Sequence, residues 1–254
     1  MPPESRQRIG DCEVFILGTV AGFVPDGERV RTAFESWRPD AVALGVPDED
    51  LASLGFLAKH PMPASLIGAH EAPPPRRRLG DPGAGAAGFE FITRPAPPPP
   101  PQDPSSLPVA GLDAASARLL ELLAPFGATR LPSPDLEVAW QAASAAGVRV
   151  VALDLSDDAH AAFYARSVSL FGLVGRQRAQ GRALQRPIPA QDAYELAIKW
   201  DAIVNGPRSL ARVEAERERH MAARLREEAA TVKRLLAVVP VARLAGVLAN
   251  LAKP

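Results

Sequence analysis

The fold is decided by residues 12–50, "CEVFILGTVAGFVPDGERVRTAFESWRPDAVALGVPDED". The apolar run at 14–17 is short and is followed by a glycine, which is typical of a buried strand. A helix is predicted over 27–37, with Asp26 as its N-cap and apolar residues spaced i, i+3, i+4 and i+7. Residues 41–46 form a second buried-strand pattern. Two such strands joined by a helix predict a parallel unit whose functional residues lie at the carboxyl edge of a sheet.

The rest of the chain alternates in the same way, with one interruption. Residues 73–108 hold 12 of the 27 prolines and predict an extended insertion, with a short edge strand at 89–94 inside it. We expect one three-layer α/β domain over 12–251, with a central, mostly parallel sheet and a helical block before the last strand. The further helices are predicted at 113–123, 134–146, 159–171, 190–204, 208–233 and 242–251, and the further strands at 148–155 and 234–241.

Composition excludes several classes of function. Lysine plus arginine and aspartate plus glutamate number 29 each, so no net field attracts nucleic acid or an anionic membrane. The single cysteine, Cys12, excludes an internal disulfide and a cysteine-based zinc site. The polar amino terminus is no secretory signal, and no apolar run is long enough to span a bilayer. We therefore expect a cytoplasmic protein with neither a nucleic acid nor a membrane as partner, and no nucleotide-binding motif indicates a cofactor.

Three segments occur in an order and at a spacing that resemble one known family. "FILGTVAGF" is similar to a strand followed by Gly-Thr-x-His, and "SWRPDAVALGV" is similar to Arg-Pro-Asp followed by a strand. "SPDLEVAWQAASAAGVRVVALDL" is similar to a helix with an inward glutamate, here Glu137, followed by a strand that ends in an aspartate, here Asp154. "ERERHMAARL" (216–225), followed by "RLLAVVPVARLAGVLANL", resembles Glu-Arg-Asp-x-Tyr-Met-Ala and a strand with Gly-x-Gly-His. On these segments the chain resembles the TraB/PrgY family, related to the TIKI metalloproteases and the EreA/ChaN-like hydrolases.

The resemblance implies a metal-dependent hydrolase fold, but the implied metal ligands are missing here. Zinc or a similar ion needs about three protein ligands from His, Asp, Glu or Cys. No two of the four histidines have the i, i+4 spacing of a helical metal clip, so we expect no metal site. The departures are Ala21 for the first family His, Gly45 for the Glu, Pro47 for the Asp, Leu155 for an Arg, and Pro240-Val241-Ala242-Arg243 for Gly-x-Gly-His.

Arg217 is the main candidate for ligand binding, together with Gly18 and Thr19. It projects into the apolar stripe of the helix at 208–233, where a cation needs a partner or a polar cavity. Its partner could be Glu214 on the same helix, or Glu137 or Asp154 from another element. Alternatively, Arg217 lines a remnant cleft and binds a carboxylate or phosphate of a ligand.

These observations leave three hypotheses about function. The first is a TraB/PrgY-like protein that has lost catalysis and binds a peptide, a small anion or a protein partner in a remnant cleft, with a homodimer left open. The second is an active hydrolase with an altered site, in which Glu137, Asp154 and Arg217 converge on one pocket. The third is an interaction scaffold that works through the insertion at 73–108.

Overall fold

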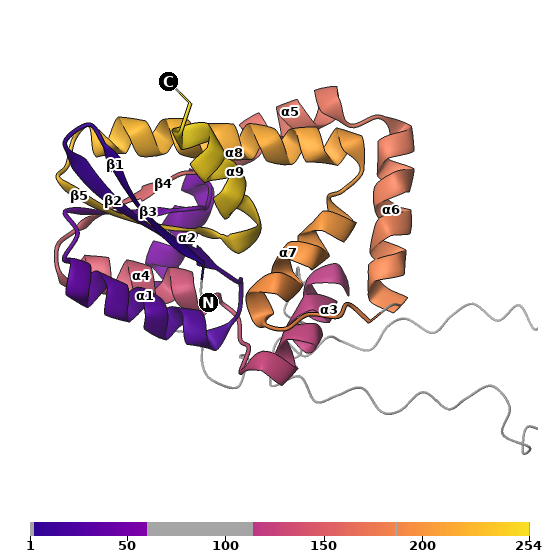
Figure 1. Cartoon of the computed structure of the whole chain (residues 1–254), viewed down its shortest axis with the longest axis horizontal. Helices are drawn as coiled ribbons and strands as arrows, with labels where there is room; N and C mark the ends of the chain where they lie inside the picture. Colours follow the sequence, from indigo (N-terminus) through magenta and orange to yellow (C-terminus); the bar gives the residue numbers. More distant parts are fainter. Residues whose placement is uncertain (1–2, 60–113, 186, 254) are drawn as a thin grey trace, which may run out of the picture.

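The computed structural model describes residues 3–59, 114–185 and 187–253 as a three-layer α/β domain (Figure 1). Its strands are β1 (Glu4–Ile9), β2 (Cys12–Thr19), β3 (Ala41–Leu44), β4 (Arg149–Ala152) and β5 (Arg234–Pro240). Its helices are α1 (Val24–Trp37), α2 (Asp48–Lys59), α3 (Ala114–Leu123), α4 (Pro134–Ala145), α5 (Asp157–Ser167), α6 (Leu170–Gln185), α7 (Ala193–Val204), α8 (Arg208–Ala229) and α9 (Val241–Leu251), with a 3-10 turn, η3 (Ala124–Phe126).

The sheet has the order β1-β2-β5-β3-β4, so the last strand in the sequence is central. β5 pairs in parallel with β2 on one side and with β3 on the other. All its residues from Leu235 to Val239 are buried, because both faces of the sheet are covered by helices. The predicted mostly parallel sheet, with a helical block before the last strand, is confirmed.

β1, like α2, is an element that sequence analysis missed. "ESRQRI" is polar and mostly exposed, and it pairs antiparallel with β2 through a two-residue turn in which Gly10 has a φ of +58°. Its alternation is weak because an edge strand with one solvated face needs little apolar patterning. β1 shields the edge of β2 and makes the sheet mixed.

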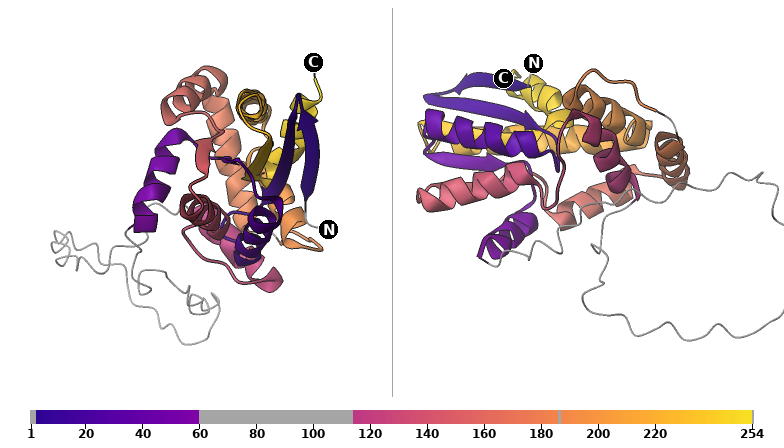
Figure 2. Two further views of the ribbon diagram at one scale, coloured as in Figure 1. Left: turned by 90° about the vertical axis from the view of Figure 1, so that its left-hand side faces the viewer. Right: turned by 90° about the horizontal axis from the view of Figure 1, so that it is seen from below.

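Each face of the sheet has its own hydrophobic core. α8 and α9 cover one face, where Met221 and Leu225 pack against Ile16 and Ala237 of the strands. α1, α2 and α4 cover the other face, where Val30 packs among the side chains of β2 and β5. Figure 2 shows the two helical layers on opposite sides of the strands.

A third group of helices, α3, α6 and α7, lies beyond the carboxyl ends of the strands (Figure 1). The helix predicted over 159–171 is wrong: α5 ends at Ser167, and α6 starts at Leu170 and continues to Gln185. Asp26 is also no N-cap, because α1 begins at Val24 and Asp26 lies in its first turn. The insertion at 73–108 and its edge strand lie outside the described residues. No helix within the described ranges is long and apolar enough to cross a membrane.

Candidate functional site

Thr19 ends β2 and belongs to a buried hydroxyl–carboxylate cluster. Its Oγ1 donates to Oδ2 of Asp135 at 2.5 Å, and Ser133 Oγ donates to Oδ1 of the same carboxyl at 2.5 Å. Asp135 is 3% exposed and no cation contacts it among the described residues. Burial raises the pKa of Asp135, as does the charge of nearby Asp26, while the two hydroxyl donors oppose the shift. The cluster fastens the start of α4 to the end of β2.

Asp26 forms a second buried cluster at the same edge. Its Oδ2 accepts from the backbone N–H of Val20 at 2.7 Å, and its Oδ1 accepts from Arg29 at 2.6 Å and from the Tyr194 hydroxyl at 2.8 Å. Arg29 also donates to the carbonyl of Gly18 at 3.2 Å. Burial, followed by the hydrogen bond and charge of Asp26, raises the pKa of Tyr194, so this phenol stays protonated.

Gly18 and Thr19, the predicted ligand-binding pair, are enclosed by protein. A Cβ at Gly18 would lie 3.0 Å from Cδ2 of Leu244 and 3.2 Å from Pro3. Thr19 is 3% exposed and its hydroxyl is committed to Asp135. Both residues connect elements at the sheet edge.

Arg217 reaches the end of β4 from α8. Its Nε donates to Oδ1 and Oδ2 of Asp154 at 3.2 and 3.1 Å, its Nη2 donates to Oδ2 at 2.5 Å, and its Nη1 donates to Glu214 at 2.9 Å. Burial alone would lower the pKa of Arg217, but the hydrogen bonds and charges of Asp154 and Glu214 outweigh it and raise the pKa. Two of the partners predicted for Arg217 are therefore present together.

Arg243, in the first turn of α9, is 5% exposed and contacts three carboxylates. Its Nη2 donates to Asp201 of α7, and its Nη1 lies 3.2 Å from Glu218 and 3.3 Å from Glu214 of α8. Glu214 thus contacts both Arg243 and Arg217.

We call this set the arginine–carboxylate network: Arg217, Arg243, Asp154, Asp201, Glu214 and Glu218. Four carboxylates against two guanidinium groups give 2 − 4 = −2 with every group ionised. Burial raises the pKa of Glu218; Arg243 opposes this, while the charges of Glu214 and Asp201 add to it. The raised pKa means that Glu218 takes up a proton more readily than a free carboxyl group does, and a proton there would reduce the excess negative charge.

The residues present do not fit the metal ion that the resemblance implies. Arg243 supplies a cation where the family has a histidine, and a guanidinium cannot ligate a metal. A Cβ at Gly45 would lie 2.8 Å from Cδ of Pro240 and 3.2 Å from Cα of Val239, so the space for a glutamate there is filled. Within the described residues, no group of three or more His, Cys, Asp or Glu side chains could hold a metal.

Glu137 lies apart from the other candidate catalytic groups. It pairs with Arg130 at 2.7 Å and accepts from Gln141 on its own helix, with about a third of its side chain exposed. Asp154 and Arg217 contact each other and not Glu137. The convergence that an altered hydrolase site requires is therefore not among the contacts of these three side chains.

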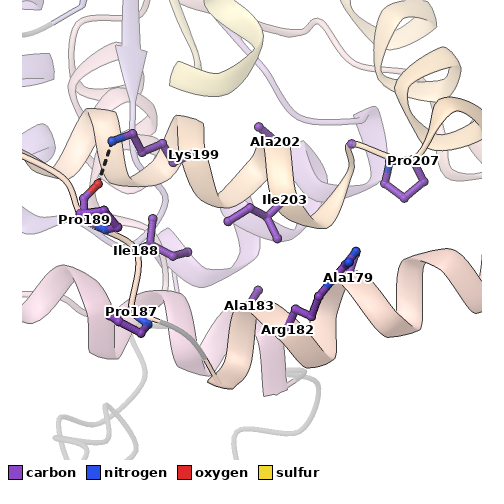
Figure 3. Close-up of a pocket in the computed structure, with 11 residues that line it drawn as sticks. Ala179, Arg182, Ala183, Pro187, Ile188, Pro189, Lys199, Ala202, Ile203 and Pro207 are labelled. Atoms are coloured by element: carbon purple, nitrogen blue, oxygen red, sulfur yellow. Dashed lines mark hydrogen bonds between the residues drawn. The ribbon is translucent and has the colours of Figure 1, made fainter.

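A pocket of about 780 Å³ lies between α6 and α7 (Figure 3). None of Gly18, Thr19, Glu137, Asp154 and Arg217 lines it. Its wall is mainly apolar, with Arg182 and Lys199 as its cations. The Lys199 ammonium is committed to Glu195 at 2.7 Å and to the carbonyl of Pro189 at 2.8 Å. Arg182 has no hydrogen bond or ion pair within the described part of the chain. The lining residues include Ala179, Arg182, Ala183, Ile188, Lys199 and Ile203.

Comparisons of the chain with protein-family models and with curated proteins gave no match. The fold and the contacts at the sheet edge therefore carry the functional argument.

Sequence reasoning missed most of the buried polar groups at this edge. Asp135 and Asp201 lie on helices whose apolar pattern drew attention away from them. Glu218 had a detectable signal, since Glu214 and Glu218 are four residues apart and lie on the same face of one helix. Their contact with Arg243 depends on how α9 crosses α8, which no local pattern specifies.

Gly246 of α9 provides a test of this packing. A Cβ there would overlap both carboxylate oxygens of Glu218. Gly246→Ala should therefore lower the free energy of unfolding by about 1–3 kcal/mol, despite the better helix propensity of alanine. The control is Gly175→Ala in α6, where nothing lies within 4 Å and stability should rise by up to about 1 kcal/mol. Urea denaturation measures both; equal effects of the two substitutions would contradict the packing.

The raised pKa of Asp135 predicts how the stability of the protein depends on pH. Because its pKa is raised, the folded protein binds this proton more tightly than the unfolded chain, and the wild type loses stability as the pH rises above about 4. Asp135→Asn removes this loss. The free energy of unfolding of the variant minus that of the wild type should therefore increase between about pH 4 and pH 7, measured by urea denaturation. A difference that falls with pH would mean that Asp135 is ionised in the folded state.

Proposed function

We propose that this chain is a TraB/PrgY-like protein that lacks catalysis and binds a peptide or small anion. The observation that carries the proposal is the pairing of Arg243 with Glu218. These residues stand where the family has the histidine of Gly-x-Gly-His and the aspartate of Glu-Arg-Asp. Two positions aligned from separate motifs meet in space, which supports the alignment, and their side chains form a salt bridge instead of a metal site.

Changes at the other motif positions support the same proposal. Pro240 replaces a glycine and fills the space beside Gly45, where the family has a glutamate. The two replacements are sterically matched, because a side chain at residue 45 and a proline at residue 240 could not both fit. Asp154 and Glu214 remain at the edge, where both are paired with Arg217.

The pocket between α6 and α7 is the place for the ligand in this proposal. Its volume lies in the range of ordinary small-molecule sites. Apolar side chains beside Arg182, which has no partner among the described residues, suit a molecule that has an apolar body and one negative group. Arg182 would bind a carboxylate, while Ile188 and Ile203 contact apolar side chains. A peptide ending in apolar residues has this chemistry. The scaffold hypothesis concerns residues outside the described ranges, and a cytoplasmic location stays a proposal.

Metal content tests the loss of catalysis. Elemental analysis of the protein purified without an affinity tag should find no stoichiometric metal, and titration with zinc, manganese and cobalt should give no site of about micromolar affinity, because the carboxylates at the edge are paired with arginines. One equivalent of tightly bound metal would overturn the proposal.

A variant that restores the implied metal ligands tests the alignment. Ala21→His, Gly45→Glu, Pro240→Gly and Arg243→His together restore three ligand side chains and the space they need, so this variant should gain one metal ion. A folded variant that binds no metal would show that the resemblance misplaces the ligands.

Peptide titration tests the pocket. An apolar hexapeptide with a free carboxyl terminus should bind to the wild type about 10–100-fold more tightly than its carboxy-terminal amide, because a hydrogen bond to a charged group contributes about 1.5–3 kcal/mol. Arg182→Gln should remove this preference, whereas Lys199→Gln should retain it. Isothermal titration calorimetry gives the three affinities. An unchanged preference in Arg182→Gln would place the carboxylate elsewhere.

A further inference from the structure

The beginning of α6 exposes a cluster of large apolar side chains that no part of the described chain covers. Leu170 is 79% exposed and Phe171 90%, with Leu173 at 42% and Val174 at 47%. We call these four residues the α6 tip. They occupy the first two turns of the helix, at the end of the molecule farthest from the sheet (Figure 1). Contiguous apolar exposure of this kind marks an interaction surface.

The helix packs through a different face. Ala179 and Ala183 are 1% exposed and face α7 and α3, and Gly172 lies directly against Ser209 of α8. At 100° per residue, Leu170 and Val174 lie on the opposite side from these contacts, and Phe171 lies about 100° away from them. The exposure of the tip is therefore fixed by the packing of the rest of α6.

Positive charge surrounds the tip. Residues 159–191 contain five arginines and no aspartate or glutamate, in a chain whose total charge is zero. Arg166 lies at the end of α5, four residues before Leu170, and Arg178 lies one turn after Val174 on α6, and both are exposed. Arginine and large apolar side chains on one exposed surface are the composition of interfacial membrane contacts.

We propose that the α6 tip docks the protein on an anionic lipid surface. Leu170 and Phe171 enter the boundary between headgroups and acyl chains, while the arginines contact lipid phosphates. A protruding cluster at one end of the molecule suits insertion better than a flat protein interface, which needs about 800 Å² from each partner. Nucleic acid would satisfy the arginines but not bury Leu170 or Val174.

This docking requires no transmembrane segment and is separate from the proposed ligand pocket. The sequence predicted no membrane partner because the chain has no net charge and no apolar span. Both arguments concern whole-chain or long-range properties. The tip is a local feature of four side chains and the arginines around them, so neither property bears on it.

Flotation with lipid vesicles tests the proposal. The full chain should float with phosphatidylcholine vesicles that contain about 30% phosphatidylglycerol, and bind at least about tenfold more weakly to pure phosphatidylcholine. Leu170→Ser with Phe171→Ser should weaken binding to the anionic vesicles at least about tenfold. Arg166→Gln with Arg178→Gln should weaken it by about five- to thirtyfold, and added salt should act in the same direction.

The control is Ile198→Ser. Ile198 is a 47% exposed isoleucine on α7, so it makes the same apolar-to-polar change away from the tip and should leave binding unchanged. All these positions are exposed, and circular dichroism verifies that each variant is folded. Failure of the wild type to float, equal binding by the tip variant, or equal binding to neutral vesicles would each overturn the proposal. In the first case an acidic protein would become the expected partner.

Discussion

The central position of β5 is the constraint on which the rest of this structure depends. Its two neighbours, β2 and β3, are both contributed by the first 44 residues, yet they do not pair with each other. The sheet is therefore complete only when residues 234–240 are in place. Because α9 follows β5 directly, the same strand delivers Arg243 to the carboxyl edge. One late segment supplies both the middle of the core and the cation that organises the site.

Four carboxylates lie together at the carboxyl edge, and this arrangement brings cations to them. Asp154, Asp201, Glu214 and Glu218 converge from three elements, and removing that many charges from water is costly unless cations accompany them. In a metallohydrolase a metal ion provides the positive charge. Here Arg243 and Arg217 provide the positive charge. An arginine that contacts several carboxylates is held in place, and its N–H donors are already used. Such an edge is suited to holding helices in place.

The pocket and the α6 tip both involve helix α6. α6 contributes small residues to its packed face, a cation to the pocket beside α7, and large apolar residues to the far end of the molecule. A helix with so few large buried side chains gains little from packing. Its exposed leucines and phenylalanine are therefore better explained by a contact outside the chain than by the needs of the fold.

Local patterns in the sequence determined the element types, because buried strands and amphipathic helices have short-range signatures: "VFIL", "AVAL" and "RLLAVV" are strands, and the helices at 208 and 242 begin within a residue of their predicted starts. Only the tertiary structure decided the strand order, the pairing of Arg243 with Glu218, the closure of Gly45 by Pro240, and which side of α6 faces water. Each of these depends on contacts between residues far apart in the sequence, and the free energy of such contacts is set by the packing of whole elements against one another.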